Sequence, residues 1–508
     1  MSCPDGAPQG IDMRDRCAAV VGLAREGEAL TRFLVQRGCR VVATDLRSPA
    51  TFGDRLRPLA ESGVHLVLGG HPPSLLDECE VVFVSPGVPF DSPLLNEART
   101  RGILLSTESR LFCQLCPAPI VAITGSSGKT TSTSLVGEIL RVGQRTTWVG
   151  GNIGQPLIDS LEQIRAEDSV VMELSSFQLE YYHPSANVHV GDVHPAWMPL
   201  LSGWSPSVGA ILNITPNHLD RHASMEAYIH AKRAIVAYRR SWDVAVLSLE
   251  NPVARELGME LYGDVRWFSH LSPVPRGAYL SGSGGEAMIV LRRTRNGVWE
   301  QSADTSRRGE EIEEQAVCRV ADIQLRGEHN VDNILAACAI SDALAVPVVA
   351  MRQVCTTFRG VSHRLEWVGD VGGVHYYDDS IATSPERLVA ALKSFDEPIV
   401  LLAGGRDKHL PWHEAAQLML KRTRHVILFG EAAALIDGAL AEARAGEAPA
   451  QDGDLSTIQQ CATLEDAVSL ATRVARKGDV VLLSPGCASF DAFADFAERG
   501  ARFRELVS

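Results

Sequence analysis

The segment from Val121 to Thr131 constrains the fold of this chain more than any other. It reads Val-Ala-Ile-Thr-Gly-Ser-Ser-Gly-Lys-Thr-Thr, and the apolar residues that follow at 135, 136, 139 and 140 have helical spacing. The segment therefore predicts a strand, a loop of small residues and a helix in direct succession. Small side chains leave the loop N–H groups open to one anion, and the helix N-terminus adds a partial positive charge.

The residue types in this loop predict nucleotide binding. Lys129 adds a full positive charge, and the Thr130 hydroxyl would lie where a phosphate-bound Mg²⁺ needs an oxygen ligand. The usual nucleotide loop begins with one more glycine, at the place where this chain has Ile123, so the loop is a short form. The expected ATP-binding residues here are Gly125, Ser126, Ser127, Gly128, Lys129, Thr130 and Thr131.

The composition of the whole chain limits the class of protein. Of 508 residues, 45% are hydrophobic and 22% charged, as in an ordinary globular protein. The formal net charge of −14 argues against nucleic-acid binding and favours small-molecule substrates. No apolar run approaches the ~20 residues of a membrane span, and the N-terminus lacks the features of an export signal. We expect a cytoplasmic monomer that does not insert into membranes.

The cysteines predict reduced thiols. The chain has 11 of them and no export signal, and one close pair, Cys113 and Cys116, could indicate zinc or redox chemistry. No second pair completes four ligands, and Cys116 leads directly into the strand of the phosphate loop. We interpret the pair as structural, at a junction between domains.

The chain is predicted to be an α/β protein of three domains. Residues 1–115 alternate strands at 17–21, 40–44 and 81–84 with helical segments such as 26–37, which predicts a Rossmann-like N-terminal domain with a parallel sheet. The Gly22–Gly27 run has the layout of a dinucleotide fingerprint, but Ala24 replaces its middle glycine, which disfavours NAD. An acid at Asp45 keeps the possibility of another nucleotide open.

Two further domains follow. Residues 116–359 are predicted to form a central P-loop ATPase-like domain, with a polar section at 281–315 interpreted as hairpins and surface loops, and a Pro- and Trp-rich excursion at 181–206. Residues 360–508 are predicted to form a C-terminal doubly wound Rossmann-like domain. Its strands end at turns around 378–380, 404–405, 430 and 484–486, where ligands of such sheets gather.

Three residues of the central domain have more than one interpretation. Glu173 follows an apolar strand and suits a Mg²⁺ ligand, although it could be a surface carboxylate. His218, with Asp220 and His222, could ligate zinc or cap the following helix. Lys232 lies on a helix that starts near Met225, and from spacing alone it is a solvated surface residue.

These segments together resemble the Mur ligases, which are ATP-dependent amide-forming enzymes. The similarity rests on the phosphate loop, Gly151–Gly154, the Glu-Leu-Ser-Ser-Phe-Gln-Leu-Glu run at 173–180, residues 213–222, 326–333 and 362–366, and the Ser-Pro-Gly-Cys-Ala-Ser-Phe-Asp run at 484–491. The runs at 173–180 and 484–491 are most similar to those of the member that adds D-glutamate to UDP-N-acetylmuramoyl-L-alanine. The resemblance covers all three expected domains in order.

The resemblance implies a mechanism and a set of cofactors. The γ-phosphate of ATP would activate a carboxylate as an acyl phosphate, which the amine of D-glutamate attacks. Lys129 would hold phosphates, Thr130 and Glu173 one Mg²⁺, and His218 a second Mg²⁺ supported by carbamoylated Lys232, so these four side chains are the expected catalytic and metal residues. Carbamoylation needs a neutral amine, so the resemblance places Lys232 in surroundings that lower its pKa, against the surface interpretation.

The same resemblance assigns the remaining binding residues. Four are expected at the adenosine part of ATP: Asn330, Asn333, Arg364 and Asp379. Four are expected at the UDP-linked substrate: Asp45, Arg47, Gly87 and Asn152. Four more are expected around the incoming amino acid: Thr383, Lys408, Ser489 and Phe496.

One departure bears on specificity. Members of the family often have a lysine in the Asp-Ser-Lys-Ala-Thr stretch, where this chain has Ile381. One cation near the incoming amino acid is therefore missing. The alternatives are a sister ligase that adds another amino acid, such as L-glutamate, and a non-catalytic nucleotide-binding relative.

Overall fold

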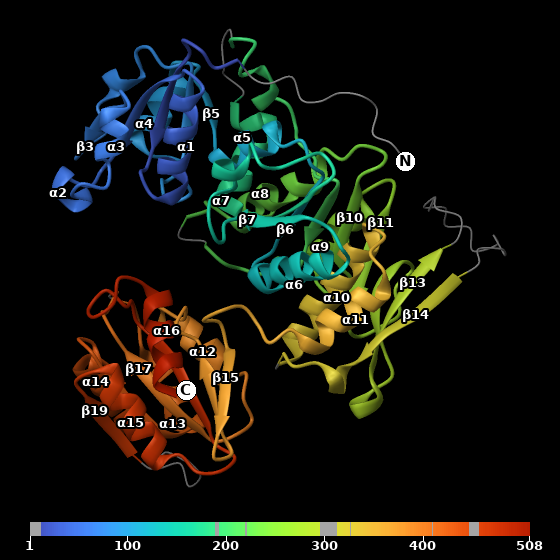
Figure 1. Cartoon of the computed structure of the whole chain (residues 1–508), viewed down its shortest axis with the longest axis vertical. Coiled ribbons are helices and arrows are strands. Elements are labelled where there is room, and N and C mark those ends of the chain that lie inside the picture. The colour runs from blue at the N-terminus through green and yellow to red at the C-terminus, as the bar shows by residue number, and fades with distance from the viewer. Residues whose placement is uncertain are drawn as a thin grey trace. The chain divides into compact units, whose positions relative to one another are not determined.

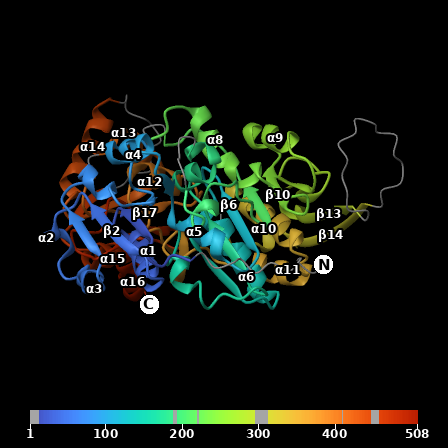
Figure 2. The same ribbon diagram turned by 90° about the horizontal axis from the view of Figure 1, so that it is seen from above.

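The computed structural model describes residues 12–187, 193–218, 221–294, 312–325, 327–408, 410–446 and 457–507. The chain divides into two compact units, Met1–Ile323 with His329–Thr356, and Gln324–Glu328 with Thr357–Ser508. The first unit holds two β-sheets and the second holds one, each accompanied by helices (Figure 1, Figure 2). The α/β class is confirmed, whereas the boundaries at 115/116 and 359/360 stay predictions.

The N-terminal sheet has five parallel strands in the order β3-β2-β1-β4-β5. This is the classic Rossmann strand order without its sixth strand, which agrees with the predicted Rossmann-like domain. Its strands are β1 Cys17–Val21, β2 Arg40–Asp45, β3 His65–Leu68, β4 Val81–Val84 and β5 Leu104–Ser106. Its helices are α1 Arg25–Gln36, α2 Pro49–Phe52, α3 Arg57–Glu61, α4 Pro93–Thr100 and α5 Glu108–Leu115.

The central sheet has nine strands in the order β14-β13-β12-β11-β10-β9-β6-β8-β7. They are β6 Ile120–Thr124, β7 Thr147–Gly151, β8 Ser169–Glu173, β9 Val208–Ile211, β10 Val244–Ser248, β11 Val265–Ser269, β12 Gly277–Ser281, β13 Met288–Thr294 and β14 Ile312–Arg319. The helices are α6 Lys129–Val142, α7 Ser176–Leu179, α8 Met225–Ala237, α9 Pro252–Met259, α10 Glu328–Ala343 and α11 Val348–Thr357. β6 lies between β8 and β9 and pairs in parallel with both, which places the phosphate loop inside the sheet.

The two unusual sequence stretches of this domain have different outcomes. The antiparallel strands β12, β13 and β14 confirm hairpins in the described part of 281–315. The 181–206 excursion forms short 3-10 helices and packs on the N-terminal sheet: the buried Trp197 ring meets Phe83 at 5.9 Å, and Asn187 exchanges two hydrogen bonds with the Leu105 backbone. The described part of this stretch therefore fastens the first two sheets together.

The C-terminal unit has six strands in the order β15-β16-β20-β17-β18-β19, all parallel except the β15–β16 pair. They are β15 Glu366–Val371, β16 Val374–Asp378, β17 Ile399–Gly404, β18 Thr423–Phe429, β19 Thr457–Cys461 and β20 Val480–Gly486. The helices are α12 Pro385–Leu392, α13 His413–Arg422, α14 Ala433–Gly446, α15 Leu464–Val474 and α16 Phe496–Val507.

Alternating side chains of the central strand show why this last sheet is doubly wound. Leu401 and Ala403 of β17 enter one apolar core, while Val400 and Leu402 enter another. A strand buried on both faces needs helices on both sides, which is the predicted arrangement. Leu401 and Leu402 illustrate how neighbouring positions in a continuous apolar run serve opposite cores.

The structure bears on two expectations from the composition, one about the cysteines and one about membrane spans. Cys113 is buried in α5 beside Met172 and Tyr182, which agrees with a structural thiol. Among the described residues, no helix is both long and apolar enough to cross a membrane. The expected cytoplasmic location and monomeric state stay predictions.

Candidate active site

The phosphate loop connects the end of β6 to the start of α6. Gly128, the residue before the helix, has φ +78°, and a Cβ at this position would lie 2.2 Å from Asn333 Oδ1. A side chain is therefore excluded by both backbone conformation and space. Lys129 Nζ donates to the Gly125 carbonyl at 3.0 Å, which places the ammonium group over the loop.

Asn213 fixes the conformation of this loop, and sequence reasoning gave it no role. Its backbone carbonyl accepts the Ser126 N–H at 2.9 Å, and its Oδ1 accepts the Ser127 N–H at 2.9 Å. The Ser126 hydroxyl lies 2.9 Å from the Tyr228 hydroxyl. The sequence offered one signal for this role of Asn213, namely its position just after β9. Because β9 and β6 are parallel neighbours, they end at the same edge of the sheet.

The first turns of α10 bring two predicted ATP-binding residues to the loop. Asn333 Nδ2 donates to Asn330 Oδ1 at 2.9 Å, and the Ser132 hydroxyl donates to Asn333 Oδ1 at 3.3 Å. Because Asn333 also contacts Gly128, the pair lies directly beside the loop. Thr131 is buried at the start of α6.

Glu173 is buried, with 2% of its surface exposed, so the surface interpretation is wrong. The Thr130 hydroxyl donates to its Oε2 at 2.8 Å, and Asn152 Nδ2 donates to its Oε1 at 2.9 Å. A hydroxyl oxygen and a carboxylate at hydrogen-bond distance beside a phosphate loop match the hard oxygen ligands that Mg²⁺ prefers. The residues present therefore fit one magnesium ion bound with a nucleotide.

Lys232 is 1% exposed on α8, so the surface interpretation of this residue is wrong as well. Its Nζ donates to Thr124 Oγ1 at 3.2 Å and to the Gly125 carbonyl at 2.9 Å. Burial, reinforced by the charge of Lys129 and opposed by that of Glu173, lowers the pKa of Lys232 well below its usual range. A lowered pKa favours the neutral amine, which is the form that carbamoylation requires.

His218 lies close to the side chain of Phe177. Its backbone has φ +54°, a left-handed conformation that is uncommon for a residue with a side chain, and its ring centroid lies 5.0 Å from that of Phe177. Such strain is frequent at functional sites. A metal-binding role for His218 stays a prediction.

His222, four residues after His218 in the same motif, has both ring nitrogens engaged within the protein. One ring nitrogen lies 2.9 Å from the Ser176 hydroxyl and the other 3.0 Å from Glu180 Oε1. Asp220, the acid between the two histidines, lies outside the described residues. The zinc interpretation therefore loses one of its two histidines, because both nitrogens of His222 are used within the protein.

A cavity of about 950 Å³ lies between the N-terminal and central sheets of the first unit. Its lining includes all four residues predicted for the UDP-linked substrate: Asp45, Arg47, Gly87 and Asn152. It also includes residues that the sequence did not single out, among them Arg25, Glu26, His71 and Ser85. Its volume is in the range of sites for small-molecule ligands.

Asp45 and Arg47 form one rigid unit at this cavity. Arg47 Nη2 lies 2.7 Å from Asp45 Oδ2, and Arg47 Nε donates to Oδ1 at 2.9 Å, while the Leu23 N–H donates to Oδ2 at 2.8 Å. Burial raises the pKa of this carboxyl, but the Arg47 and Leu23 donors outweigh it and hold the pKa at about 2. Asp45 is therefore a fixed negative charge.

Glu26 of α1 is a second carboxyl at the cavity, and its pKa is shifted in the opposite direction to that of Asp45. Burial raises its pKa to about 7, although Gln178 Nε2 donates to its Oε1 at 3.1 Å. Its Oε2 is buried and has no hydrogen-bond partner among the described residues. Gln178 Oε1 also accepts the Ser175 N–H, so the 173–180 motif connects the end of β8 with α1. The sequence signal that could have indicated Glu26 as a site residue was its position inside the Gly22–Gly27 run.

In the C-terminal unit, the predicted amino-acid residues gather after strands β16, β17 and β20. Lys408 Nζ donates to Thr383 Oγ1 at 2.9 Å. Ser489 is buried after β20, and the carbonyl of Phe496, at the start of α16, accepts the Ser380 hydroxyl at 2.8 Å. Parallel strands thus bring residues from three loops to one edge of the sheet.

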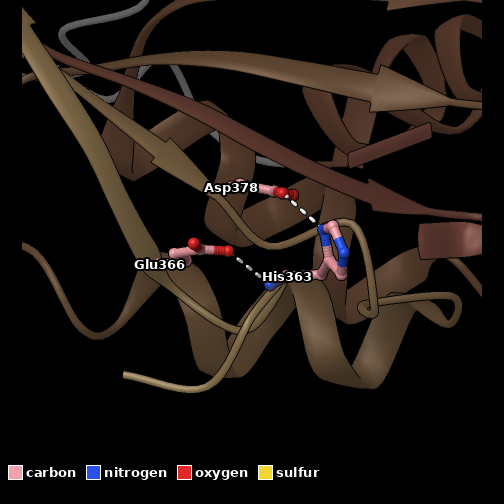
Figure 3. Close-up of side chains that lie close together, drawn as sticks. All are labelled: His363, Glu366 and Asp378. Carbon is pink, nitrogen blue, oxygen red and sulfur yellow. Dashed lines mark hydrogen bonds and ion pairs between the residues drawn. The ribbon is translucent and has the colours of Figure 1, made fainter. Parts of the chain in front are cut away.

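Three potential metal ligands of this unit, His363, Glu366 and Asp378, have donor atoms within 4.8 Å of one another (Figure 3). Their contacts indicate a structural clamp instead. His363 Nδ1 lies 2.7 Å from Asp378 Oδ2, Glu366 Oε2 accepts the His363 N–H at 2.8 Å, and Asp378 Oδ1 accepts the Ser380 N–H at 2.9 Å. Arg504 also lies 3.1 Å from Glu366. The Glu366 and Asp378 carboxylates therefore hold neighbouring loops together.

This clamp positions the predicted adenosine residues Arg364 and Asp379. Arg364 lies between His363 and Leu365, whose φ values of +64° and +44° are uncommon for residues with side chains. The Leu365 N–H donates to Asp379 Oδ1 at 3.2 Å, and the Ser484 hydroxyl donates to Oδ2 at 2.8 Å. Burial nevertheless raises the pKa of Asp379 to about 7.

The fold and the site together define a class of enzymes that consist of a phosphate-loop domain and two Rossmann-like domains. Residues 16–106 match the Mur ligase MurD-like N-terminal domain, 123–341 the Mur ligase middle domain, and 363–487 the Mur ligase glutamate ligase domain. The chain belongs to the Mur ligase family.

Curated relatives match the chain over nearly its whole length. A protein of Symbiobacterium thermophilum is 40% identical over 98% of this chain and 99% of its own. Proteins of Koribacter versatilis and Clostridium kluyveri are each 37% identical, covering 98% and 96% of this chain and the same shares of their own. All three are named UDP-N-acetylmuramoylalanine–D-glutamate ligase.

Solved structures share the fold at lower identity. The UDP-N-acetylmuramate-alanine ligase of Thermotoga maritima has a TM-score of 0.53 and 19% identity, covering 97% of this chain and 99% of its own. MurF of Acinetobacter baumannii has a TM-score of 0.51 and 18% identity, covering 85% and 86%. At these identities the likeness concerns the fold alone.

Proposed function

We propose that this protein is an ATP-dependent ligase that joins D-glutamate to UDP-N-acetylmuramoyl-L-alanine in peptidoglycan precursor synthesis. The observation that carries the proposal is the contact between Asn152 and Glu173. Through this contact, the cavity lined by the predicted UDP-substrate residues adjoins the Glu173 carboxylate, which also accepts the Thr130 hydroxyl of the phosphate loop. The full-length similarity to ligases of that name supports the choice of substrates.

The chemistry accounts for the residue types. A carboxylate is a poor electrophile, so one oxygen of the L-alanyl carboxylate attacks the γ-phosphorus of ATP, and ADP leaves. The amine of D-glutamate then attacks the acyl carbon, phosphate leaves, and the amine loses a proton. Phosphoryl transfer between two anions requires charge neutralisation and alignment more than covalent help.

Each residue of the loop has a role in this scheme. Lys129 and the loop N–H groups that Asn213 does not occupy bind the phosphates, and Asn330 with Asn333 contacts the adenosine. The Gly128 position has no space for a Cβ because Asn333 packs against it, which keeps Asn333 beside the loop. Arg364 and Asp379, held by the His363 clamp, complete the adenosine contacts in our proposal.

Thr130 and Glu173 would hold one magnesium ion, and His218 with carbamoylated Lys232 a second. When bound, the ions supply positive charge to the transferring phosphoryl group. The low pKa of the buried Lys232 amine supports the carbamate, because only a neutral amine adds carbon dioxide. The hydrogen bonds of Lys232 to Thr124 and Gly125 fix its Nζ under the loop.

A substrate panel tests this proposal. The protein is incubated with ATP, Mg²⁺, UDP-N-acetylmuramoyl-L-alanine and single amino acids, and released phosphate and ligated product are measured. We expect both with D-glutamate and neither with L-glutamate. A response to a different amino acid would identify a sister ligase, and nucleotide binding without any product would indicate a non-catalytic relative. Lys129→Ala serves as the inactive control.

A further inference from the structure

Because this chain has Ile381 where family members often have a lysine, the expected amino-acid pocket lacks one cation. An arginine lies close to this position. Arg387, on α12, donates from Nη1 to the Ile381 carbonyl at 3.0 Å. That same carbonyl accepts the Thr383 N–H at 2.8 Å. The Thr383 hydroxyl in turn accepts Lys408 Nζ at 2.9 Å. A chain of hydrogen bonds through Ile381 and Thr383 therefore links Arg387 to Lys408.

The electrostatics of this arrangement are unfavourable without an anion. Arg387 lies in the first turn of α12 (Figure 1), where the partial positive charge of a helix N-terminus disfavours a cation. Burial, followed by the charge of Arg387, lowers the pKa of Lys408. Neither Arg387 nor Lys408 forms an ion pair with a carboxylate among the residues that the structure describes. Two cations linked through Ile381 and Thr383 in this way favour a bound anion.

Other cations at this edge of the sheet are already engaged. Arg406 forms a two-pronged ion pair with Glu431, with both contacts at 2.9 Å. Arg499 is fully buried and donates to backbone carbonyls, including those of Ser380 and Cys487. Arg387 is exposed and makes one hydrogen bond to a neutral carbonyl, so its remaining donors can reach a ligand.

We propose that Arg387 is a specificity-determining residue that binds a carboxylate of the incoming dicarboxylic amino acid, replacing the lysine that Ile381 displaces. The inference rests on the proposed ligase function and deepens it. Arg387 and Lys408 together supply two cations for the two carboxylates of glutamate. The planar guanidinium adds a geometry that suits a carboxylate, which a single ammonium group lacks.

Steady-state kinetics of Arg387→Ala test the proposal. We expect the KM for D-glutamate to rise roughly 10- to 100-fold, the range for loss of a hydrogen bond between charged groups. The KM values for ATP and UDP-N-acetylmuramoyl-L-alanine should stay unchanged. Arg387→Lys should recover part of the loss, and so should Ile381→Lys added to Arg387→Ala. Lys393→Ala, an exposed cation that follows the same helix, is the matched control and should have no effect.

The outcomes separate this inference from the proposed function. An unchanged KM for the amino acid in Arg387→Ala, while the wild type ligates D-glutamate, would overturn the role of Arg387 alone. If the wild type instead uses L-glutamate, the same variants assayed with that amino acid decide the inference, while the proposed D-glutamate activity fails. A wild type that accepts only amino acids with one carboxylate would overturn both.

Discussion

The side-chain amide of Asn152 donates to Glu173 Oε1 at 2.9 Å, while Asn152 also lines the large cavity of the first unit. The substrate cavity and the phosphate-loop site therefore share one hydrogen bond. The other oxygen of Glu173 accepts the Thr130 hydroxyl at 2.8 Å. A single buried carboxylate thus connects the substrate cavity with the phosphate loop.

Asn152→Ala should weaken both the substrate site and the position of Glu173. We expect kcat/KM for the UDP-linked substrate to fall roughly 10- to 100-fold, because a hydrogen bond to a charged group is lost. The KM for D-glutamate and the midpoint of thermal unfolding should change little. Normal kcat/KM in a correctly folded variant would contradict the coupling of the two sites.

Lys232→Ala should abolish ligation, because the buried amine is the expected site of carbamoylation. A small added carboxylate, such as formate or acetate, should restore part of the activity by occupying the vacated space. Arg233→Ala is the matched control on the same helix, since its ion pair with Glu260 is exposed and contributes little. Full activity of Lys232→Ala without additive would eliminate the carbamate.

Gly128→Ala should prevent nucleotide binding. The new Cβ would meet Asn333 Oδ1 at 2.2 Å, and φ +78° is unfavourable for alanine. The wild type should unfold at a higher temperature with millimolar Mg-ATP than without it, and the variant should lose this shift. Gly438→Ala, a position with open space in α14, is the control. A full nucleotide shift in Gly128→Ala would refute the loop's role.

Glu26→Gln should change how stability depends on pH. The folded pKa of Glu26 is about 7, above its ordinary value of 4.5, so the folded protein binds more protons than the unfolded chain between these values. The wild-type free energy of unfolding therefore falls as pH rises from about 4.5 to about 7, by up to roughly 3 kcal/mol from this group.

The glutamine variant lacks this titration but keeps the acceptor for Gln178. Its stability relative to wild type should increase across the same pH window, measured by denaturant unfolding at several pH values. Glu61→Gln, which removes an exposed carboxylate of α3, is the control and should not reproduce this increase. A constant difference for Glu26→Gln would disprove the raised pKa.

Much of the fold was predictable because it is encoded locally. The strand at 17–21, the strand at 81–84 and the helix starting at Met225 were identified from periodicity, and the structure has them at those positions. β15 was not predicted: its Glu-Trp-Val-Gly-Asp-Val sequence contains a glycine and two acids, and it is ordered by antiparallel pairing with β16. Pairing between strands is a tertiary property that a single segment does not reveal.

The sequence by itself determined the phosphate loop, the order of the sheets and the residue types at the strand ends, because these depend on neighbours along the chain. Only the tertiary structure decided the environment of each side chain. Lys232 and Thr124 are 108 positions apart, yet their contact makes a predicted surface lysine a buried amine. Similarly, the Glu26 carboxyl acquires its raised pKa from the residues that surround it. Burial and nearby charge set the protonation of these groups, and both depend on which distant segments fold together.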